Sequence, residues 1–524
     1  MCASDEFDFL PRSQAASRYY HRLDDLNARR MAEHVEALKD YQAKFLLQVP
    51  KAKNLEERID CETLAASAGR ALTRLDKTKS WQENPLLYLK IAFIGLDHAL
   101  EKPASNEKEG LERASERLAS LPRLLKQGTE NIQAAPKPLS KAALAMLKDC
   151  EKYVAELQKA YHAKARKFTS LLDNASLALQ DFKAFLKTVP GTRPKTSASG
   201  LKTTLRHHFE CTRPLKEIYA ILEQDRQESL KALTALQRQI DLGKTWLEIQ
   251  NSPLAPKARN LGTKALYQKE IKGLRDFFLD RVFNGKYPDC ALDFKDTPTY
   301  LRSIRGSGSF AAGFSNDPAE TSYFYATDGA LSGKSKDEKK RLDLRLAKEV
   351  KFLAAHETYP GHHFLDCFRR TLANPVRRQI ENPLFYEGWA CFAESLLVEY
   401  KYAAEPVQAL TYYKRRLWRA ARGMIDVGLA TDRLNKAQCA DLLVEVGFSE
   451  KEARDQVGRF GLNPGYQLCY SLGRYEIQEL CDRFTPTFGM SGFVTALLSG
   501  GEIAFHSAGE RMEDMEKSAG GKPF

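Results

Sequence analysis

The sequence predicts a mainly α-helical protein with one small β element near residues 305–327. Apolar residues recur three and four positions apart over long segments of the first half, and this spacing lines one face of a helix. Only TSYFYAT, at 321–327, has the β-branched and aromatic content of a strand. The chain has 524 residues and is 43% hydrophobic, which is enough for a large buried core.

Two amphipathic runs define the predicted helices of the first half. The second run begins at Leu215 and ends at Ile240. The first run forms one continuous stripe, on a long helix or a helix pair, made of Leu147, Cys150, Val154, Leu157, Tyr161, Phe168, Leu172, Ala175, Leu179, Phe182 and Leu186. Between the runs, VPGTRPKTSASG at 189–200 predicts a linker or exposed loop. We therefore expect an N-terminal helical region, 1–190, and a helical region with the candidate catalytic motifs, 201–524, packed as one globular unit.

The composition shifts between about 284 and 336, where glycine and serine are frequent. Its segment RGSGSFAAG lacks the strand, turn and helix of a dinucleotide-binding fingerprint. A flexible loop and a substrate-binding edge strand both stay open for this region. The chain then becomes helical again, with one apolar face that leads directly into the next motif and consists of Leu342, Leu346, Val350 and Leu353.

Charge and composition exclude several classes of protein. The net charge of +12 comes from 80 basic and 68 acidic residues that are interleaved along the helices, which is typical of solvated helix faces and not of a nucleic-acid-binding surface. No apolar run reaches about eighteen residues, so we expect no membrane partner. The polar start, MCASDEFDFLPRSQ, does not have the pattern of a signal peptide, which predicts a cytoplasmic protein. The ten cysteines form no close CxxC pair, so any metal must bind histidine and carboxylate side chains.

The stretch AAHETYPGHHFL at 354–365 is the strongest candidate for a metal site. In an HExxH helix, two histidines four residues apart bind one zinc ion, and the glutamate acts on water. Here a Pro-Gly pair interrupts that spacing. On a regular helix His363 would align with His356, but Pro360 predicts a kink or bulge. Because removing two residues restores the four-residue offset, we favour His356 and His362 over His363 as ligands.

A third ligand is expected in NPLFYEGWACFAESLLVEY at 382–400. Glu387 and Glu394 are seven residues apart, so they share a helix face with Cys391. A carboxylate on an apolar helix is costly to bury unless it is paired or binds a metal. The spacing therefore favours Glu387 as the third ligand and Glu394 as a group that supports a ligand. The alternative, that one or both face solvent, stays open.

Three motifs together resemble one bacterial family. HETYPGHH, YEGWACFAE and NPGYQLCYSLGRYEI match, in order and spacing, the HExxPGH, EGWAxYxE and PGxxxxYxxGR motifs of the family called domain of unknown function 885. The match covers about the last 240 residues well. The resemblance implies a helical, zincin-like metallopeptidase with a deep cleft, related to the carboxypeptidase Taq group.

The resemblance also implies roles for single residues. It assigns zinc to His356, His362 and Glu387, and it makes Glu357 the general base. In that family the residue after the second histidine of the motif varies, which supports His362.

The third motif adds Tyr470 as a donor to the oxyanion and Arg474 as a partner for a substrate carboxylate. The alternative for both is structural: a packed aromatic ring and a salt bridge to a helix carboxylate. Tyr466, where relatives often have glutamine, and His363 are predicted to contact substrate.

The sequence thus predicts a zinc-dependent hydrolase of peptide or amide bonds, most specifically a carboxypeptidase that acts on short peptides. One alternative is a metallohydrolase or lyase that acts on a non-peptide small molecule. Another is an inactive helical scaffold that binds a partner. Whether the chain forms a homo-oligomer stays open.

Overall fold

The computed structural model describes residues 21–101, 107–162, 165–192, 196–252, 263–283, 287–305, 308–312, 320–326 and 348–518. These residues are mostly helical, so the predicted mainly α class is confirmed. Over the same residues, no helix is both long enough and apolar enough to span a membrane. The predicted deep cleft stays a prediction.

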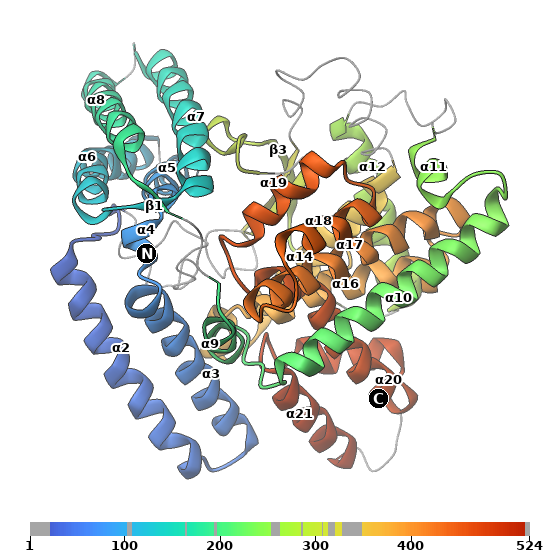
Figure 1. Cartoon of the computed structure of the whole chain (residues 1–524). Coiled ribbons are helices and arrows are strands. Elements are labelled where there is room, and N and C mark those ends of the chain that lie inside the picture. Colours follow the sequence, from blue (N-terminus) through green and yellow to red (C-terminus); the bar gives the residue numbers. More distant parts are fainter. Residues whose placement is uncertain are drawn as a thin grey trace.

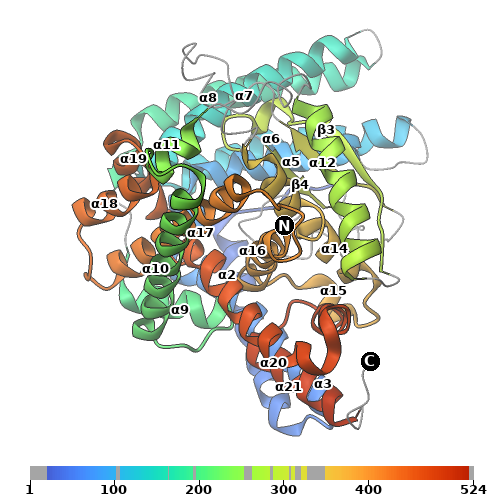
Figure 2. The ribbon, with the colours of Figure 1, turned by 90° about the vertical axis from the view of Figure 1, so that its right-hand side faces the viewer.

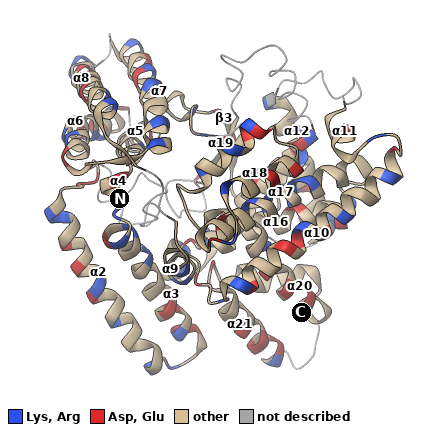
Figure 3. Cartoon of the chain, viewed as in Figure 1, with Lys and Arg blue, Asp and Glu red and all other residues tan. Residues whose placement is uncertain are grey.

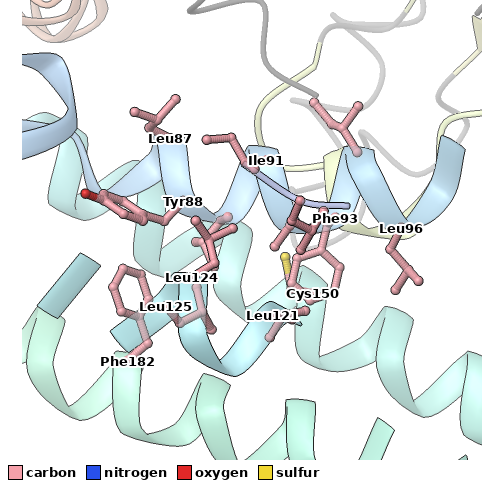
Figure 4. Close-up of a cluster of buried hydrophobic side chains, with 14 of the residues drawn as sticks. Leu87, Tyr88, Ile91, Phe93, Leu96, Leu121, Leu124, Leu125, Cys150 and Phe182 are labelled. Atoms are coloured by element: carbon pink, nitrogen blue, oxygen red, sulfur yellow. The ribbon is translucent and has the colours of Figure 1, made fainter. Parts of the chain in front are cut away.

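The first half of the chain forms a helical pair followed by a bundle (Figure 1). Its helices are α2 (Ala28–Gln48), α3 (Leu55–Leu72), α4 (Ser80–Glu83), α5 (Pro85–Glu101), α6 (Glu107–Asn131), α7 (Lys137–Tyr161) and α8 (Arg166–Thr188). The predicted stripe from Leu147 to Leu186 is a helix pair, because α7 ends at Tyr161 and α8 begins at Arg166. The stripe faces α5 and α6, where Tyr88, Leu124 and Phe182 meet in one apolar core (Figure 4).

The second half of the chain contains the motif-bearing helices and the helices that pack against them. Helix α10 lies along α17, and α16 lies along α20. Helix α21 packs beside α3 at the lower end of the molecule (Figure 2), where Arg511 Nε is 2.9 Å from Glu56 Oε1. The bounds are α9 (Ala198–His208), α10 (Leu215–Ile240), α11 (Trp246–Asn251), α12 (Thr263–Phe277), α14 (His362–Thr371), α15 (Pro375–Gln379), α16 (Pro383–Glu399), α17 (Pro406–Ala430), α18 (Lys436–Val446), α19 (Glu450–Phe460), α20 (Cys469–Leu498) and α21 (Phe505–Ser518).

A three-stranded sheet lies beside the motif region. Its order is β3 (Leu292–Asp296), β5 (Ser322–Ala326) and β4 (Gly308–Ala311), with β5 parallel to β3 and antiparallel to β4. Phe324 of β5 pairs with Phe294 on one side and Phe310 on the other. The predicted strand at 321–327 is therefore confirmed in β5. Strand β4 lies within the predicted β element and at the edge of the sheet, so the edge-strand alternative for this region is the one observed. Strand β3 was not predicted, because its apolar residues alternate over too short a length.

The motif helix breaks at the predicted Pro-Gly pair. A helix whose described part covers 348–357 ends at Glu357, the chain bends over 358–361, and α14 begins at His362. Gly361 is required at this bend, because a Cβ there would lie 2.0 Å from the carbonyl oxygen of His356. Trp389 Nε1 of α16 donates to the carbonyl of Pro360 at 2.8 Å and so ties the bend to the second motif.

Helices α16 and α20 touch through two glycines. A Cβ on Gly388 would lie 2.5 Å from the backbone of Gly473, and a Cβ on Gly473 would lie 2.1 Å from the carbonyl oxygen of Leu384. The absence of both side chains lets the two backbones approach closely. This contact brings the second and third motifs together.

Other predictions have mixed outcomes. The predicted linker or exposed loop at 189–200 has no buried residue in its described part. It is shorter than predicted, since α9 begins at Ala198 and the short strands β1 (Ala135–Pro136) and β2 (Gly191–Thr192) pair with each other. Leu342 and Leu346 lie outside the described residues. The N-terminal bundle shares its apolar core with Tyr300 and Leu301, and the division into regions 1–190 and 201–524 stays a prediction.

The interleaved surface charges and the unpaired cysteines agree with the sequence predictions. Basic and acidic residues alternate over the helices on the face shown in Figure 3. The cysteines of the described residues are all free thiols, and most are buried.

We predict that Gly388→Ala destabilises the protein, because the added methyl group meets the backbone of Gly473. Overpacking of this kind lowers the free energy of unfolding by about 1–3 kcal/mol. Gly458→Ala in α19 is the matched control, since nothing lies within 4 Å of its added Cβ, and it should be neutral or slightly stabilising. Urea unfolding followed by circular dichroism measures both. Equal stability of the two variants would contradict the close helix contact.

Candidate metal centre

Three side chains from separate segments converge at the bend. His356 lies at the end of the helix over 348–357, His362 at the start of α14, and Glu387 in α16. One ligand atom from each lies within 4.8 Å of the others, and all three side chains are buried. Glu387 Oε2 is 3.3 Å from His356 Nε2 and 3.7 Å from His362 Nε2.

This arrangement fits a zinc ion. Two ligands of one tetrahedral zinc lie about 3.3–3.6 Å apart, which matches these separations. Glu387 Oε2 is buried and has no hydrogen-bond partner among the described residues. Burial alone would raise the pKa of Glu387, but His356 and His362 hold this pKa well below its usual value. Two imidazoles and one carboxylate, with a fourth position free, are a common ligand set for catalytic zinc.

Glu394 lies behind His356 and fixes its orientation. Its Oε1 is 3.0 Å from His356 Nδ1, so a neutral imidazole with its proton on Nδ1 turns Nε2 toward Glu387. Burial alone would lower the pKa of His356, yet contacts with Cys391 and the two glutamates raise it well above its usual value. The pocket therefore favours positive charge beside these carboxylates. Because Glu394 is 0% exposed, the alternative that it faces solvent is excluded.

Two arginines of α17 neutralise Glu394. Arg415 donates through Nε at 2.8 Å and Nη2 at 2.9 Å, and Arg419 donates through Nη1 at 2.9 Å. Burial would raise the pKa of Glu394, but these two guanidinium groups hold it well below its usual value. Neither arginine was predicted as part of the site. Their signal was a helical spacing of basic residues, 415, 419 and 422, that places them near one face of the helix.

Tyr466 supports the ligand Glu387. Its hydroxyl donates to Glu387 Oε1 at 2.7 Å, which leaves Oε2 to face the two histidines. The turn that carries Tyr466 is held by Asp426, whose carboxylate accepts from the backbone N–H of Gln467 at 3.0 Å. Tyr466 thus positions a ligand, and its predicted contact with substrate stays a prediction.

Tyr470 lies against the same centre. Its ring stacks on His356, with 6.5 Å between ring centroids, and Arg422 Cζ lies 3.8 Å from its centroid. Burial raises the pKa of the Tyr470 hydroxyl well above its usual range, so this group stays protonated and can donate a hydrogen bond. Whether it stabilises an oxyanion stays a prediction.

The predicted substrate contact of His363 is wrong. The side chain is 0% exposed, and its Nε2 lies 3.1 Å from both the carbonyl oxygen of Cys290 and the hydroxyl of Tyr359. Burial lowers its pKa to about 4, which keeps the imidazole neutral. The bend turns His363 into the core, while its neighbour His362 faces the metal ligands.

Arg474 has a partner within the protein. Its Nη2 donates to Asp225 Oδ1 at 3.0 Å, and Arg416 pairs with the same carboxylate. The structure therefore shows the salt bridge to a helix carboxylate that the sequence had left as the alternative. The predicted contact between Arg474 and a substrate carboxylate is not retained.

Glu357 follows His356 directly, and its side chain is half-buried. Its Oε2 accepts from the backbone N–H of Phe310 in β4 at 2.9 Å. The edge strand β4 thus anchors one oxygen of the candidate general base. This contact could not be predicted from the local sequence, since 47 residues separate the two groups.

Comparison with known proteins places the whole chain in one family. The family model described as "Bacterial protein of unknown function (DUF885)" matches residues 11–508. The chain belongs to the DUF885 family. This extends the resemblance seen in the last 240 residues over nearly the full length.

Two solved structures share the fold of this DUF885 protein. One is a "putative lipoprotein of unknown function" from Shewanella oneidensis, with a TM-score of 0.73, 18% identity and 94% of each chain covered. The other is a "putative lipoprotein" from Colwellia psychrerythraea, with a TM-score of 0.71, 16% identity and 92% of each chain covered. No curated protein matches the sequence.

We predict about one zinc ion per chain after purification with zinc present, because the three ligand atoms already converge. His356→Ala and His362→Ala should both lose the ion. His363→Ala is the matched control and should keep it, since this side chain points into the core. Elemental analysis of the purified proteins measures the content. A zinc-free wild type, or zinc retained by His362→Ala, would contradict the assignment.

We predict that Tyr466→Phe in this DUF885 protein weakens zinc binding about 10- to 100-fold, because it removes the hydrogen bond that orients Glu387. Tyr475→Phe is the matched control. It removes a tyrosine-glutamate hydrogen bond, to Glu479, on the surface of α20. Competition with a coloured chelator measures both affinities. Equal affinities for the two variants would show that Tyr466 does not position the ligand.

Proposed function

We propose that this DUF885 protein is a zinc-dependent hydrolase of peptide or amide bonds. The observation that carries the proposal is the convergence of His356, His362 and Glu387 next to the half-buried carboxylate of Glu357. A protein that only served as a scaffold would have no need for this combination of buried ligands, positioning groups and an adjacent base.

A zinc ion held by these three residues would polarise the substrate carbonyl and lower the pKa of water toward about 7. Glu357 would then accept a proton from water and pass it to the leaving amine. The anchoring of its Oε2 by the Phe310 N–H supports this role, because the carboxylate is held in place while Oε1 has no hydrogen bond among the described residues.

Tyr470 is proposed as the donor to the oxyanion. Its hydroxyl stays protonated because burial raises its pKa, and its ring stacks on the ligand His356. A protonated donor beside the reacting carbonyl favours the charge that develops there.

Membership of the zincin metallopeptidases, with a relationship to the carboxypeptidase Taq group, is part of the same proposal. The HE pair followed by a downstream glutamate supports it. A metallohydrolase or lyase acting on a non-peptide small molecule would use the same ligands. Hydrolysis of a peptide pool, with no turnover of other esters and amides, would distinguish the two.

The cytoplasmic location stays a prediction. It rests on the polar first residues, whereas both similar solved structures are described as lipoproteins. Fractionation of cells that express the native gene would decide between the compartments.

We predict that Glu357→Gln binds zinc like the wild type and loses turnover on a peptide pool by about 100-fold or more, because an amide cannot accept the proton. Glu450→Gln, on the exposed start of α19, is the matched control and should keep full turnover. Elemental analysis and mass spectrometry of the products measure the two properties. Wild-type turnover in Glu357→Gln would remove Glu357 as the base.

A further inference from the structure

Arg422 is a buried arginine without a carboxylate partner among the described residues. It is 7% exposed, and its Nε has no hydrogen bond. The other buried arginines of α17 differ, since Arg415 and Arg419 pair with Glu394. Arg416, six residues before Arg422, pairs with Asp225. Within α17, Arg422 thus differs from three other arginines, each of which pairs with a carboxylate.

Two aromatic rings hold the guanidinium of Arg422. Its Cζ lies 4.2 Å from the ring of Trp418 and 3.8 Å from the ring of Tyr470. Trp418 Nε1 is also buried without a hydrogen bond among the described residues. Two donors that lack acceptors therefore lie side by side.

A buried charge without a carboxylate partner is costly, which favours an anion bound beside Arg422. Burial lowers the pKa of Arg422, although Tyr470 and Glu387 favour its charge. Cation–π contacts with the two rings offset only part of the cost of burial. A planar guanidinium fixed between two rings can donate two parallel hydrogen bonds, which is the geometry that a carboxylate accepts.

The position of Arg422 links it to the metal centre. One ring, that of Tyr470, contacts both the guanidinium and the ligand His356. The guanidinium of Arg422 therefore lies close to the metal ligands, with the Tyr470 ring as their common neighbour. Arg474, which the sequence favoured for this task, is paired with Asp225.

We infer that Arg422 binds a carboxylate of the substrate, so the substrates are peptides or amides with a carboxylate near the bond that is hydrolysed. This inference rests on the proposed function for its hydrolytic part. The carboxylate has two sources, the C-terminus of a short peptide or an acidic side chain. Arg422 determines which substrates the site accepts, and the metal ligands and Glu357 do not depend on it.

The test uses acetylated tripeptides of mixed sequence, prepared as one pool with free C-terminal carboxylates and one pool of C-terminal amides. The zinc-loaded wild type should cleave carboxylate-bearing peptides about 10- to 100-fold faster, the range expected for a charged hydrogen bond. Preference for the free-acid pool identifies the C-terminus. Preference for peptides with aspartate or glutamate in both pools identifies a side chain.

Two substitutions test the residue itself. Arg422→Gln removes the charge, and Arg422→Lys keeps the charge but not the fork, so both should reduce the preference, the first to none. Zinc content and thermal unfolding of each variant show whether the centre is intact. Arg433→Gln is the matched control, because Arg433 also stacks on a ring, that of Tyr219 at 3.9 Å, and lies on the surface. It should keep the full preference.

A binding measurement separates this inference from the proposed function. Glu357→Gln, loaded with zinc, is mixed with each pool, and the retained peptides are identified by mass spectrometry. Carboxylate-dependent retention that disappears in the double variant with Arg422→Gln supports the inference even if the wild type hydrolyses nothing. Hydrolysis or retention without preference for a carboxylate, or a preference unchanged in a folded Arg422→Gln protein, would overturn it.

Discussion

The rest of the centre depends on the contacts of one buried carboxylate, that of Glu394, with two arginines and a histidine. A charge shielded from solvent is stable only if it is paired and hydrogen-bonded. Removing its partners leaves an uncompensated buried charge, which strongly lowers the free energy of unfolding. Arg415 and Arg419 supply the opposite charge from α17, and His356 uses the same carboxylate through Nδ1. One buried group thus fixes the distance between α16 and α17 and the orientation of a metal ligand at the same time.

The contact between helices α16 and α20 positions the ligand Glu387. Gly388 directly follows Glu387, and its contact with Gly473 draws α20 against α16. Tyr466, in the short turn directly before α20, then reaches Glu387 Oε1 and turns the other oxygen toward the histidines. The ligand position therefore depends on the absence of two side chains as much as on the presence of the carboxylate.

The bend at Pro360 and Gly361 explains why adjacent histidines have different roles. The break could be predicted because proline cannot continue a helix and because restoring the HExxH spacing selects His362. The burial of His363 could not be predicted, since its partners, such as the carbonyl of Cys290, come from the segment before β3. Local chemistry specified the break, and distant backbone specified where each ring points.

The sequence by itself determined the helical class, the strand β5, the break in the motif helix and the residue types that can hold a metal, because these follow from local periodicity and side-chain chemistry. Tertiary structure alone decided which charges pair. Arg474 meets a carboxylate 249 residues away, whereas Arg422 meets two rings and no carboxylate of the described residues. Pairing depends on how helices far apart in the sequence pack, and the pattern within one helix contains no information about its neighbour.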